Sequence, residues 1–445
     1  MSEAALALVE SAPAVAMPPV AEWSLARRVL FRFACLYWPL YCLTISSQIP
    51  GVSDLFGDRL CGWWARGCAF LARHIFHVGG EITVAETGSG DRIVDWVNLA
   101  VVASVALVGT IVWSAVSQRR EHERLRAGLR VFLRYVVGLV MLSYGSVKVF
   151  GGQFPPPSLG RLLQPVGKLS PMGLLWTFMG ASPAYVIFSG VGESVGALLV
   201  LFRRTATLGA LVLAGVLTNV AMMNLCYDVP VKINSTHYLA MCVFILLPDL
   251  ERLGSVLVFQ RATAALPWRR SFASRRARLA HHVVKALLVA GLGGYTVYSS
   301  VSEVWRYQHV AHPWIDGSWA VKRFVRNGHE VPALLDDNTR WNRLRFDSFD
   351  GKHAMRWHFL DGKMSDLYET KLDGSSLTLT ASDPKPGSKP AQYALVFDKL
   401  DDDHVRISGK VADDDLVAEV ERLKAGDLPL VSRGFHFVNE FPFNR

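Results

Sequence analysis

The residues best suited to chemistry lie in the apolar first two thirds of the chain. Lys148 stands near the end of a long apolar run, with Tyr144 one helical turn before it, and Glu193 lies midway along a later apolar run. A charged side chain in hydrocarbon costs roughly 2.5–3.5 kcal/mol or more, so it normally finds a partner, water or a function. A desolvated lysine with a lowered pKa acts as a base. Lys148 and Glu193 are therefore the predicted catalytic residues.

Other polar residues near these two predict a pocket that opens outward. Glycines and prolines break the chain after Lys148, and irregular backbone at membrane depth must be buried in protein or line a cavity. No set of His, Cys and carboxylate side chains has the spacing of metal ligands, so no metal site is predicted. The predicted ligand-binding residues are Tyr144, Gln153, Asn219, Asn224, Asp228, Lys232 and His237.

A purely structural interpretation of the same residues stays open. Glycines around Glu193 permit close helix approach, and a buried ion pair would fix the register of a helical bundle. Lys148 and Arg134 are both candidate partners for the Glu193 carboxylate.

Composition places these residues in a membrane domain that a soluble domain follows. Hydrophobic residues make up 51% of the 445 residues and are concentrated before about Ser300, whereas the remainder is charged and strand-like. Seven segments are long or apolar enough to span a membrane. They are Val29–Ile45, Trp96–Val116, Val131–Phe150, Pro183–Phe202, Ala206–Leu225, Ser235–Leu247 and Val283–Tyr298. The segment Met172–Met179 is too short and is interpreted as re-entrant or interfacial.

Arginine placement predicts the orientation of these spans. Alternate connections carry most of the arginines, and the positive-inside rule makes that side cytoplasmic. We expect an inner-membrane, multi-pass protein with a cytoplasmic N-terminus and an extracytoplasmic C-terminal domain. The net charge of +9 mainly reflects this topology, and no basic patch interleaved with aromatics indicates nucleic-acid binding. The arginines are Arg27, Arg28, Arg119, Arg120, Arg124, Arg126, Arg203, Arg204, Arg269, Arg270, Arg275, Arg276 and Arg278.

The six cysteines indicate small buried side chains more than redox chemistry. None forms a Cys-x-x-Cys motif, and the seven-residue spacing of Cys61 and Cys68 in an expected amphipathic helix is too long for a disulfide within that helix. A link from Cys61 or Cys68 to Cys226 stays open.

After Tyr298 the apolar pattern changes from helical to alternating. Asp350-Gly351, Asp361-Gly362 and Asp373-Gly374 recur about every dozen residues, and Asp-Gly favours tight hairpin turns. Eight or nine short strands joined by hairpins predict an up-and-down β-barrel. Whether side chains fill its interior or a ligand does stays open. The predicted strands are Ala320–Val325, Trp341–Phe346, Ala354–Phe359, Leu367–Leu372, Leu377–Thr380, Tyr393–Phe397, Val405–Ser408, Leu416–Val420 and Phe435–Val438.

Two family resemblances follow from particular motifs. The stretch from about Arg134 to Arg252 resembles the DoxX-like membrane proteins, some of which are partners in quinone-linked sulfur oxidation and respiratory redox complexes. Gly317-Ser318-Trp319 resembles the Gly-x-Trp opening of lipocalins, and the closing motif Arg433–Glu440 resembles that of longer DoxX-like members with a lipocalin-like domain. The DoxX-like motifs are Tyr144-Gly145-x-x-Lys148, Gln153-Phe154-Pro155, Gly192-Glu193, Arg203-Arg204, Asn219-Val220 and Cys226–Lys232.

A more distant resemblance is to the membrane domain of vitamin K-dependent carboxylases. By that comparison Lys148 matches the basic lysine that handles a reduced quinone. Asn219 stands where a histidine would be expected, which disfavours the carboxylase reaction while leaving quinone binding open.

Together these observations predict an α-helical membrane bundle of about seven transmembrane helices followed by an all-β, lipocalin-like barrel. The expected function is binding of a quinone or related lipid in a membrane redox system, with the bilayer and a redox protein as partners. The alternatives are a quinol-coupled carboxylase or epoxidase with Lys148 as base, and a non-enzymatic scaffold or lipid carrier. The expected parts are a disordered tail (1–22), N-terminal helices with an outer amphipathic loop (23–128), a DoxX-like core (129–252), a basic inner loop with the last membrane helix (253–310) and the barrel (311–445).

Overall fold

A computed structural model describes residues 23–45, 58–85, 87–263, 274–308, 313–334, 337, 339–349, 352–382 and 390–433. The chain divides into two compact units, each made of several stretches of sequence. The first contains 1–141, 196–221 and 230–292, and the second contains 142–195, 222–229 and 293–445.

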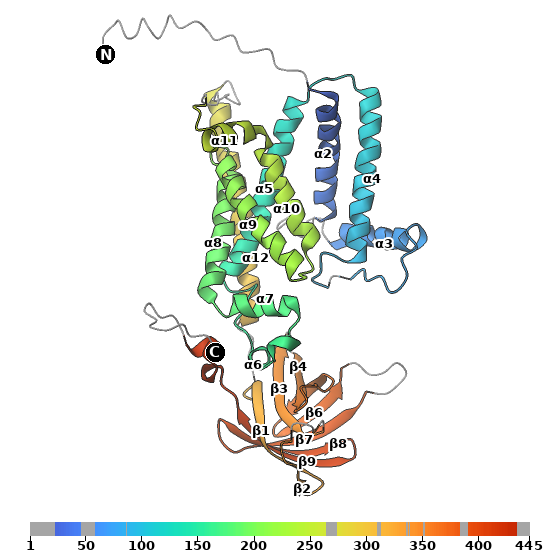
Figure 1. Cartoon of the computed structure of the whole chain (residues 1–445), viewed down its shortest axis with the longest axis vertical. Coiled ribbons are helices and arrows are strands. Elements are labelled where there is room, and N and C mark those ends of the chain that lie inside the picture. Colours follow the sequence, from blue (N-terminus) through green and yellow to red (C-terminus); the bar gives the residue numbers. More distant parts are fainter. Residues whose placement is uncertain are drawn as a thin grey trace, which may run out of the picture. The chain divides into compact units, whose positions relative to one another are not determined.

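All seven predicted spans lie in helices (Figure 1). Within the described ranges, three helices are long and apolar enough to cross a membrane: α4, α8 and α9. This length and composition indicate that the helical part is associated with a membrane. The helices that contain the predicted spans are α2 (Leu25–Thr44), α4 (Ile93–Val116), α5 (Glu123–Val149), α8 (Pro183–Leu201), α9 (Ala206–Cys226), α10 (Lys232–Leu246) and α12 (Arg275–Gln308).

Shorter helices occupy the connections. The predicted amphipathic helix is α3 (Asp58–His74), whose Cys68 and Ala72 pack on Val94 and Val97 of α4. The short apolar segment before Ser182 is α7 (Pro171–Gly180), which begins at Ser170, whose hydroxyl accepts a hydrogen bond from the Gly173 amide. The remaining short helices are α6 (Leu159–Leu162), η3 (Val166–Lys168), η4 (Leu247–Asp249), α11 (Leu250–Leu257), η5 (Ala425–Asp427) and α13 (Pro429–Ser432).

The C-terminal part is an eight-stranded antiparallel β-barrel. Neighbouring strands follow chain order, and β1 pairs with β9 to close the sheet. A two-residue strand, β2 (His329–Glu330), pairs antiparallel with the end of β1 and was not expected from the sequence. The barrel strands are β1 (Gly317–Arg326), β3 (Trp341–Phe349), β4 (Lys352–Phe359), β5 (Tyr368–Asp373), β6 (Ser376–Ala381), β7 (Gln392–Lys399), β8 (His404–Val411) and β9 (Asp414–Arg422). The structure thus confirms eight predicted strands, while Phe435–Val438 lies outside the described residues.

Local chemistry explains the barrel's turns and its closure. Gly362 and Gly374 have φ of 83° and 59°, which glycine adopts without the steric cost of a Cβ atom. The guanidinium of Arg422, on the last strand, lies 4.1 Å from the centre of the Trp319 ring on the first. It also donates to the carbonyls of Trp314 and Asp316, so β9 is fastened to the chain that leads into β1.

The barrel interior is a core of large side chains. Trp319, Phe324, Leu344, Met355 and Trp357 are at most 5% exposed and belong to one cluster that every barrel strand joins. The barrel's own aromatic and aliphatic side chains therefore form a contiguous buried cluster in its interior.

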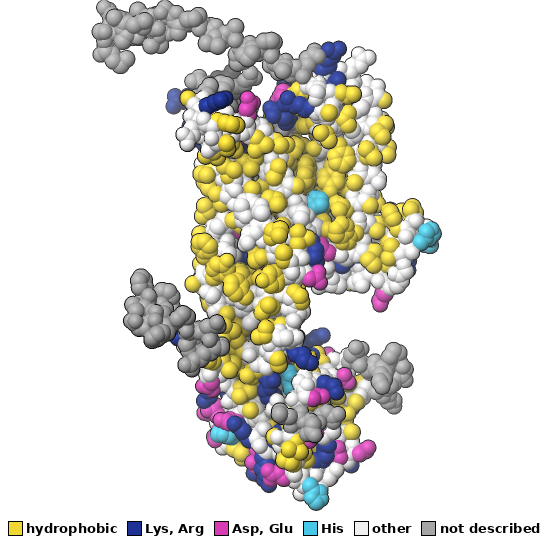
Figure 2. All heavy atoms as spheres, in the orientation of Figure 1, with side chains coloured by type: hydrophobic (Ala, Val, Ile, Leu, Met, Phe, Trp, Pro, Cys, Tyr) yellow, Lys and Arg dark blue, Asp and Glu magenta, His cyan; other side chains and the backbone are white. Residues whose placement is uncertain are grey.

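The two chemical characters predicted from composition are visible on the surface. Hydrophobic side chains dominate the visible face of the helices, whereas charged side chains gather on the barrel (Figure 2). Among the described cysteines, Cys68 and Cys226 are free, so the structure contains no link between them; the Cys61 side chain lies outside the described residues.

Candidate functional site

The site begins where helix α5 ends. Gly151 has φ of 80°, its amide donates to the Lys148 carbonyl at 3.1 Å, and the Gly152 amide donates to the Val147 carbonyl at 2.7 Å. These two bonds form a Schellman motif, in which a left-handed glycine ends a helix and satisfies its last carbonyls. The sequence Gly151-Gly152 therefore stops α5 directly after Lys148 and leaves this lysine in the last helical turn.

Two glycines bring α5 and α8 into close contact. A Cβ atom at Gly145 would lie 2.7 Å from the Gly190 carbonyl oxygen, and one at Gly190 would lie 2.7 Å from the Gly145 carbonyl oxygen and 2.8 Å from the Lys148 Cβ. No side chain fits between backbones this close. This close approach places Lys148 against α8 at Gly190, which lies one helical turn before Glu193.

Lys148 and Glu193 form a buried ion pair. The Lys148 Nζ donates to Glu193 Oε1, and their side chains are only 7% and 3% exposed. Tyr144 lies on α5, one helical turn before Lys148. The second oxygen, Oε2, is buried and has no hydrogen-bond partner among the described residues. The predicted catalytic residues are thus side by side, and one carboxylate oxygen remains available to a hydrogen-bond donor.

The chain that follows α5 is held by α7 and α12. A Cβ at Gly180 would collide with the Pro155 carbonyl, and one at Gly152 with the Val304 side chain of α12. The Phe154 ring lies 5.0 Å from that of Trp176 in α7. The Oε1 atom of Gln153, in the same loop, is buried without a hydrogen-bond partner among the described residues.

Asn224 and Asp228 lie at the C-terminal end of α9. Asp228 has φ of 52° and the Val229 amide donates to the Asn224 carbonyl at 3.0 Å, so Asp228 takes the left-handed position that ends the helix. The Asn224 side chain is 5% exposed, and its Nδ2 has no hydrogen-bond partner in the described part of the chain. Like Glu193 and Gln153, Asn224 belongs to the second unit and carries an unsatisfied buried polar atom.

Lys232 makes a different group of contacts, in the first unit. The Asp91 carboxylate accepts from the amides of Lys232 and Ile233 at 2.8 and 2.9 Å, and Lys232 Nζ lies 3.6 Å from Asp91 Oδ2. Asp91 therefore satisfies the free amides at the start of α10 and complements its helix dipole. The sequence analysis missed Asp91, although an acidic residue is the usual partner for a helix N-terminus.

His237 lies in an aromatic cluster on α2 and α10. Its ring is 4.2 Å from that of Tyr41, nearly parallel, and its Nε2 is 2.7 Å from the Tyr37 hydroxyl. Its Nδ1 lies 2.7 Å from the Ile233 carbonyl, which can only accept, so in the neutral imidazole Nε2 accepts from Tyr37. The apolar pattern of the first predicted span concealed this cluster.

The other two expected participants occupy separate positions. Arg134 donates to the carbonyls of Val200 and Leu201 at 2.8 and 2.9 Å and caps the end of α8, so Lys148 and not Arg134 is the partner of Glu193. Asn219 lies on α9 with an exposed side chain.

Comparison with known proteins supplies a relative. No protein-family model matches this chain, and no solved structure does either. YwoB of Bacillus subtilis is 32% identical to it over 132 residues, which are 29% of this chain and 82% of YwoB. The chain belongs to the YwoB family. YwoB itself is named as an uncharacterized protein, so this membership brings no activity with it.

The chemistry of this YwoB-family chain therefore has to be inferred from its own residues. Within the described ranges, no three His, Cys, Asp or Glu side chains are grouped to hold a metal ion. The second unit instead offers an ammonium, a carboxylate with a free oxygen and two amide groups with unsatisfied atoms. The structure joins Lys148 to Glu193 directly, and Gln153 and Asn224 each carry a buried polar atom elsewhere in the same unit.

Proposed function

We propose that this chain is a multi-pass inner-membrane protein of seven spans whose Lys148–Glu193 site binds the head group of a quinone or related lipid. It serves a membrane redox system, as a DoxX-like component with a lipocalin-like domain. The observation that carries the proposal is the buried pair in which Glu193 Oε2 has no partner among the described residues.

The chemistry of the pair suits a quinone head group. The Lys148 ammonium can donate to a ring carbonyl oxygen, and Glu193 can accept from the hydroxyl of the reduced form. Reduction of a quinone to its quinol takes up two electrons, which the redox partner protein would supply, and two protons, one of which a coupled lysine–carboxylate pair can hold or release. The resemblance to DoxX-like proteins, which include quinone-linked partners, supports the same assignment.

The alternatives receive less support. The carboxylase resemblance needs a histidine where this chain has Asn219, whose side chain is exposed. The lipid-carrier alternative draws on a ligand-holding barrel, and the barrel core consists of its own side chains.

Lipids that copurify with the full chain test the proposal. Quinone should be extracted from the parent and from Arg126→Gln, a control on the same helix whose ion pair with Glu123 is partly exposed. The double variant Lys148→Met/Glu193→Gln, which avoids stranding one charge, should have lost it. Equal quinone content in all three proteins would exclude this site. A phospholipid or an isoprenoid in place of quinone would favour the carrier.

The orientation has its own test. A Ser375→Cys variant in the barrel should react with a membrane-impermeant thiol reagent in intact cells whose outer membrane has been permeabilised. Labelling only after lysis would reverse the topology.

A further inference from the structure

One outer face of the barrel concentrates positive charge. In the β3–β4 hairpin, Arg343 pairs with His358 and Arg345 with Arg356. Their neighbours in sequence, Leu344 and Trp357 among them, point into the barrel core. Because side chains alternate along a strand, the three arginines and the histidine share the opposite, outer face.

Acidic side chains neutralise this face only in part. Arg345 pairs with Asp347 at 2.7 Å. Arg343 donates to the Leu163 carbonyl at 3.3 Å and Arg356 to the Met364 sulfur at 3.8 Å, and neither forms an ion pair within the described residues. Like charges directly opposite one another on a sheet are destabilising. An anion beside Arg345 and Arg356 would remove that cost.

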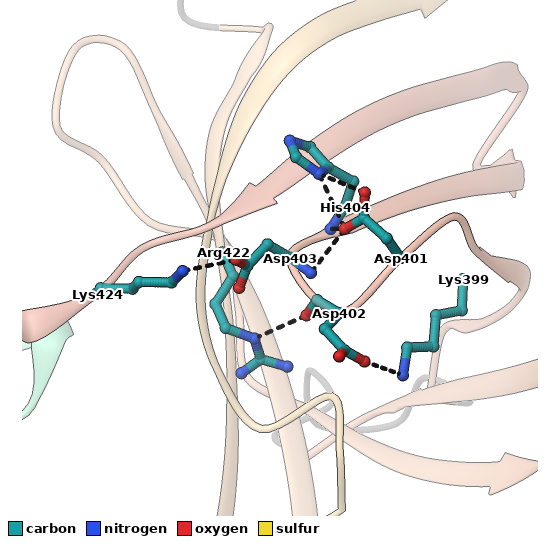
Figure 3. Close-up of polar contacts among 7 residues, drawn as sticks. All are labelled: Lys399, Asp401, Asp402, Asp403, His404, Arg422 and Lys424. Carbon is teal, nitrogen blue, oxygen red and sulfur yellow. Dashed lines mark hydrogen bonds and ion pairs between the residues drawn. The ribbon is translucent and has the colours of Figure 1, made fainter.

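A second cluster on the barrel shows the contrast. At the turn between β7 and β8, Lys399 pairs with Asp402 at 2.7 Å and Lys424 pairs with Asp403 at 2.6 Å (Figure 3). His404 likewise contacts Asp401. Cations there are neutralised by the chain itself, in contrast to Arg343 and Arg356.

The segment from α6 to α7 runs over the arginine face. A Cβ atom at Gly160 would lie only 2.6 Å from the Arg345 guanidinium, so the Gly160 backbone packs directly against that side chain. The segment adds the cations Arg161 and Lys168. It also exposes large apolar side chains, since Val166 is 72% and Phe178 61% exposed. The α6–α7 segment thus carries both cations and exposed apolar side chains within the same unit as the arginine face.

We propose that Arg343, Arg345, Arg356 and His358 bind the phosphate of an anionic phospholipid, whose acyl chains lie along the exposed apolar side chains of the α6–α7 segment. Guanidinium groups match phosphate geometry with paired hydrogen bonds. The exposed Val166 and Phe178 favour a lipid phosphate over a free one, because a soluble anion would leave them in water. This site uses none of the residues of the Lys148–Glu193 pair.

His358 makes the proposed binding pH-dependent. Burial and the charges of Arg343, Arg345 and Arg356 lower the pKa of His358 to about 4, against a smaller opposing effect of Asp347. A phosphate beside the imidazole favours its protonated form and raises its pKa. Binding therefore takes up a proton, and phospholipid affinity should increase as the pH falls from 7 to 5.

Native mass spectrometry of the full chain in detergent, titrated with phosphatidylglycerol or phosphatidylcholine, tests the proposal. The parent should retain phosphatidylglycerol preferentially. Loss of Arg356 in Arg356→Gln should weaken this retention on the order of tenfold, and Arg356→Lys less. The control is Arg406→Gln on β8, which removes the same charge from an arginine paired with Glu419 at 3.0 Å and should match the parent.

Three outcomes would overturn the proposal. Equal phosphatidylglycerol retention by Arg356→Gln and Arg406→Gln would show that the face is not a site. Displacement of the lipid by millimolar inorganic phosphate would assign the site to a free anion. Equal phosphatidylglycerol retention by the parent at pH 7 and pH 5 would show that His358 does not take part in the site. Thermal unfolding of each variant shows that it is folded, and quinone content, which this proposal leaves unchanged, separates it from the function proposed above.

Discussion

Lysine–carboxylate pairs occur in two surroundings in this molecule. Lys148 and Glu193 in the helices are 7% and 3% exposed, whereas Lys399 and Asp402 on the barrel are 47% and 96% exposed. Both are direct contacts between the same kinds of group. Water and mobile ions screen the exposed pair, so it contributes little to stability. Stranding one member of a buried pair costs roughly 3–5 kcal/mol, so burial and not geometry decides how much each pair matters.

The largest expected effect is at the buried pair. Lys148→Met leaves the Glu193 carboxylate without its cation and should lower the free energy of unfolding by about 3–5 kcal/mol. Lys148→Met/Glu193→Gln should recover most of that stability, because no charge is stranded. Chemical unfolding in detergent, followed by tryptophan fluorescence, measures both. A single variant as stable as the parent would mean that Glu193 is protonated and simply packs between helices.

The next largest effect is expected at the contact between Gly145 and Gly190, which positions this pair. Gly190→Ala places a Cβ 2.7 Å from the Gly145 carbonyl oxygen, a backbone atom that cannot rotate away. The two helices must separate, at about 1–3 kcal/mol. Gly215→Ala on α9 is the matched control, since a Cβ at this position would contact no other part of the described structure within 4 Å. Equal thermal stability of the two variants would contradict the close α5–α8 approach.

His358 is an intermediate case, half-buried among cations. Its pKa in the folded chain is lowered to about 4 from 6.5. Between these values the unfolded chain binds the proton and the folded chain does not, so stability falls as the pH decreases from about 6.5 to 4. In detergent without anionic lipid, the melting temperature of His358→Gln should fall by less between pH 7 and pH 5 than that of the parent. An identical loss in both proteins would show that another group controls the acid sensitivity.

The smallest effect is expected on the exposed pair. Lys399→Gln removes a partner of Asp402, but water solvates the remaining carboxylate. The change in unfolding free energy should be the smallest among these variants and shrink further with added salt. A loss comparable to that of Lys148→Met would refute the role assigned to burial.

Local sequence determined much of this architecture. Apolar runs predicted the helices, alternation predicted eight barrel strands, and Asp-Gly pairs marked hairpin turns that Gly362 and Gly374 form. These are properties of neighbouring residues, whose periodicity and φ preference act over a few positions. The predicted pairing of Lys148 with Glu193 also followed from the sequence. Each charge is costly to bury in an apolar span, and the two lie in successive spans, so each can serve as the other's partner.

Only the tertiary structure chose among partners. Arg134 and Lys148 were both candidate partners of Glu193; in the structure the glycine contact of α5 and α8 places Lys148 beside Glu193, and Arg134 instead caps the end of α8. The pairing of Asp91 with the start of α10 and the Tyr37–His237 contact join residues far apart in sequence, and the hairpin register places Arg345 opposite Arg356. The sequence alone shows that a buried charge or a free helix end needs a partner. Which group becomes that partner depends on which surfaces the fold brings together.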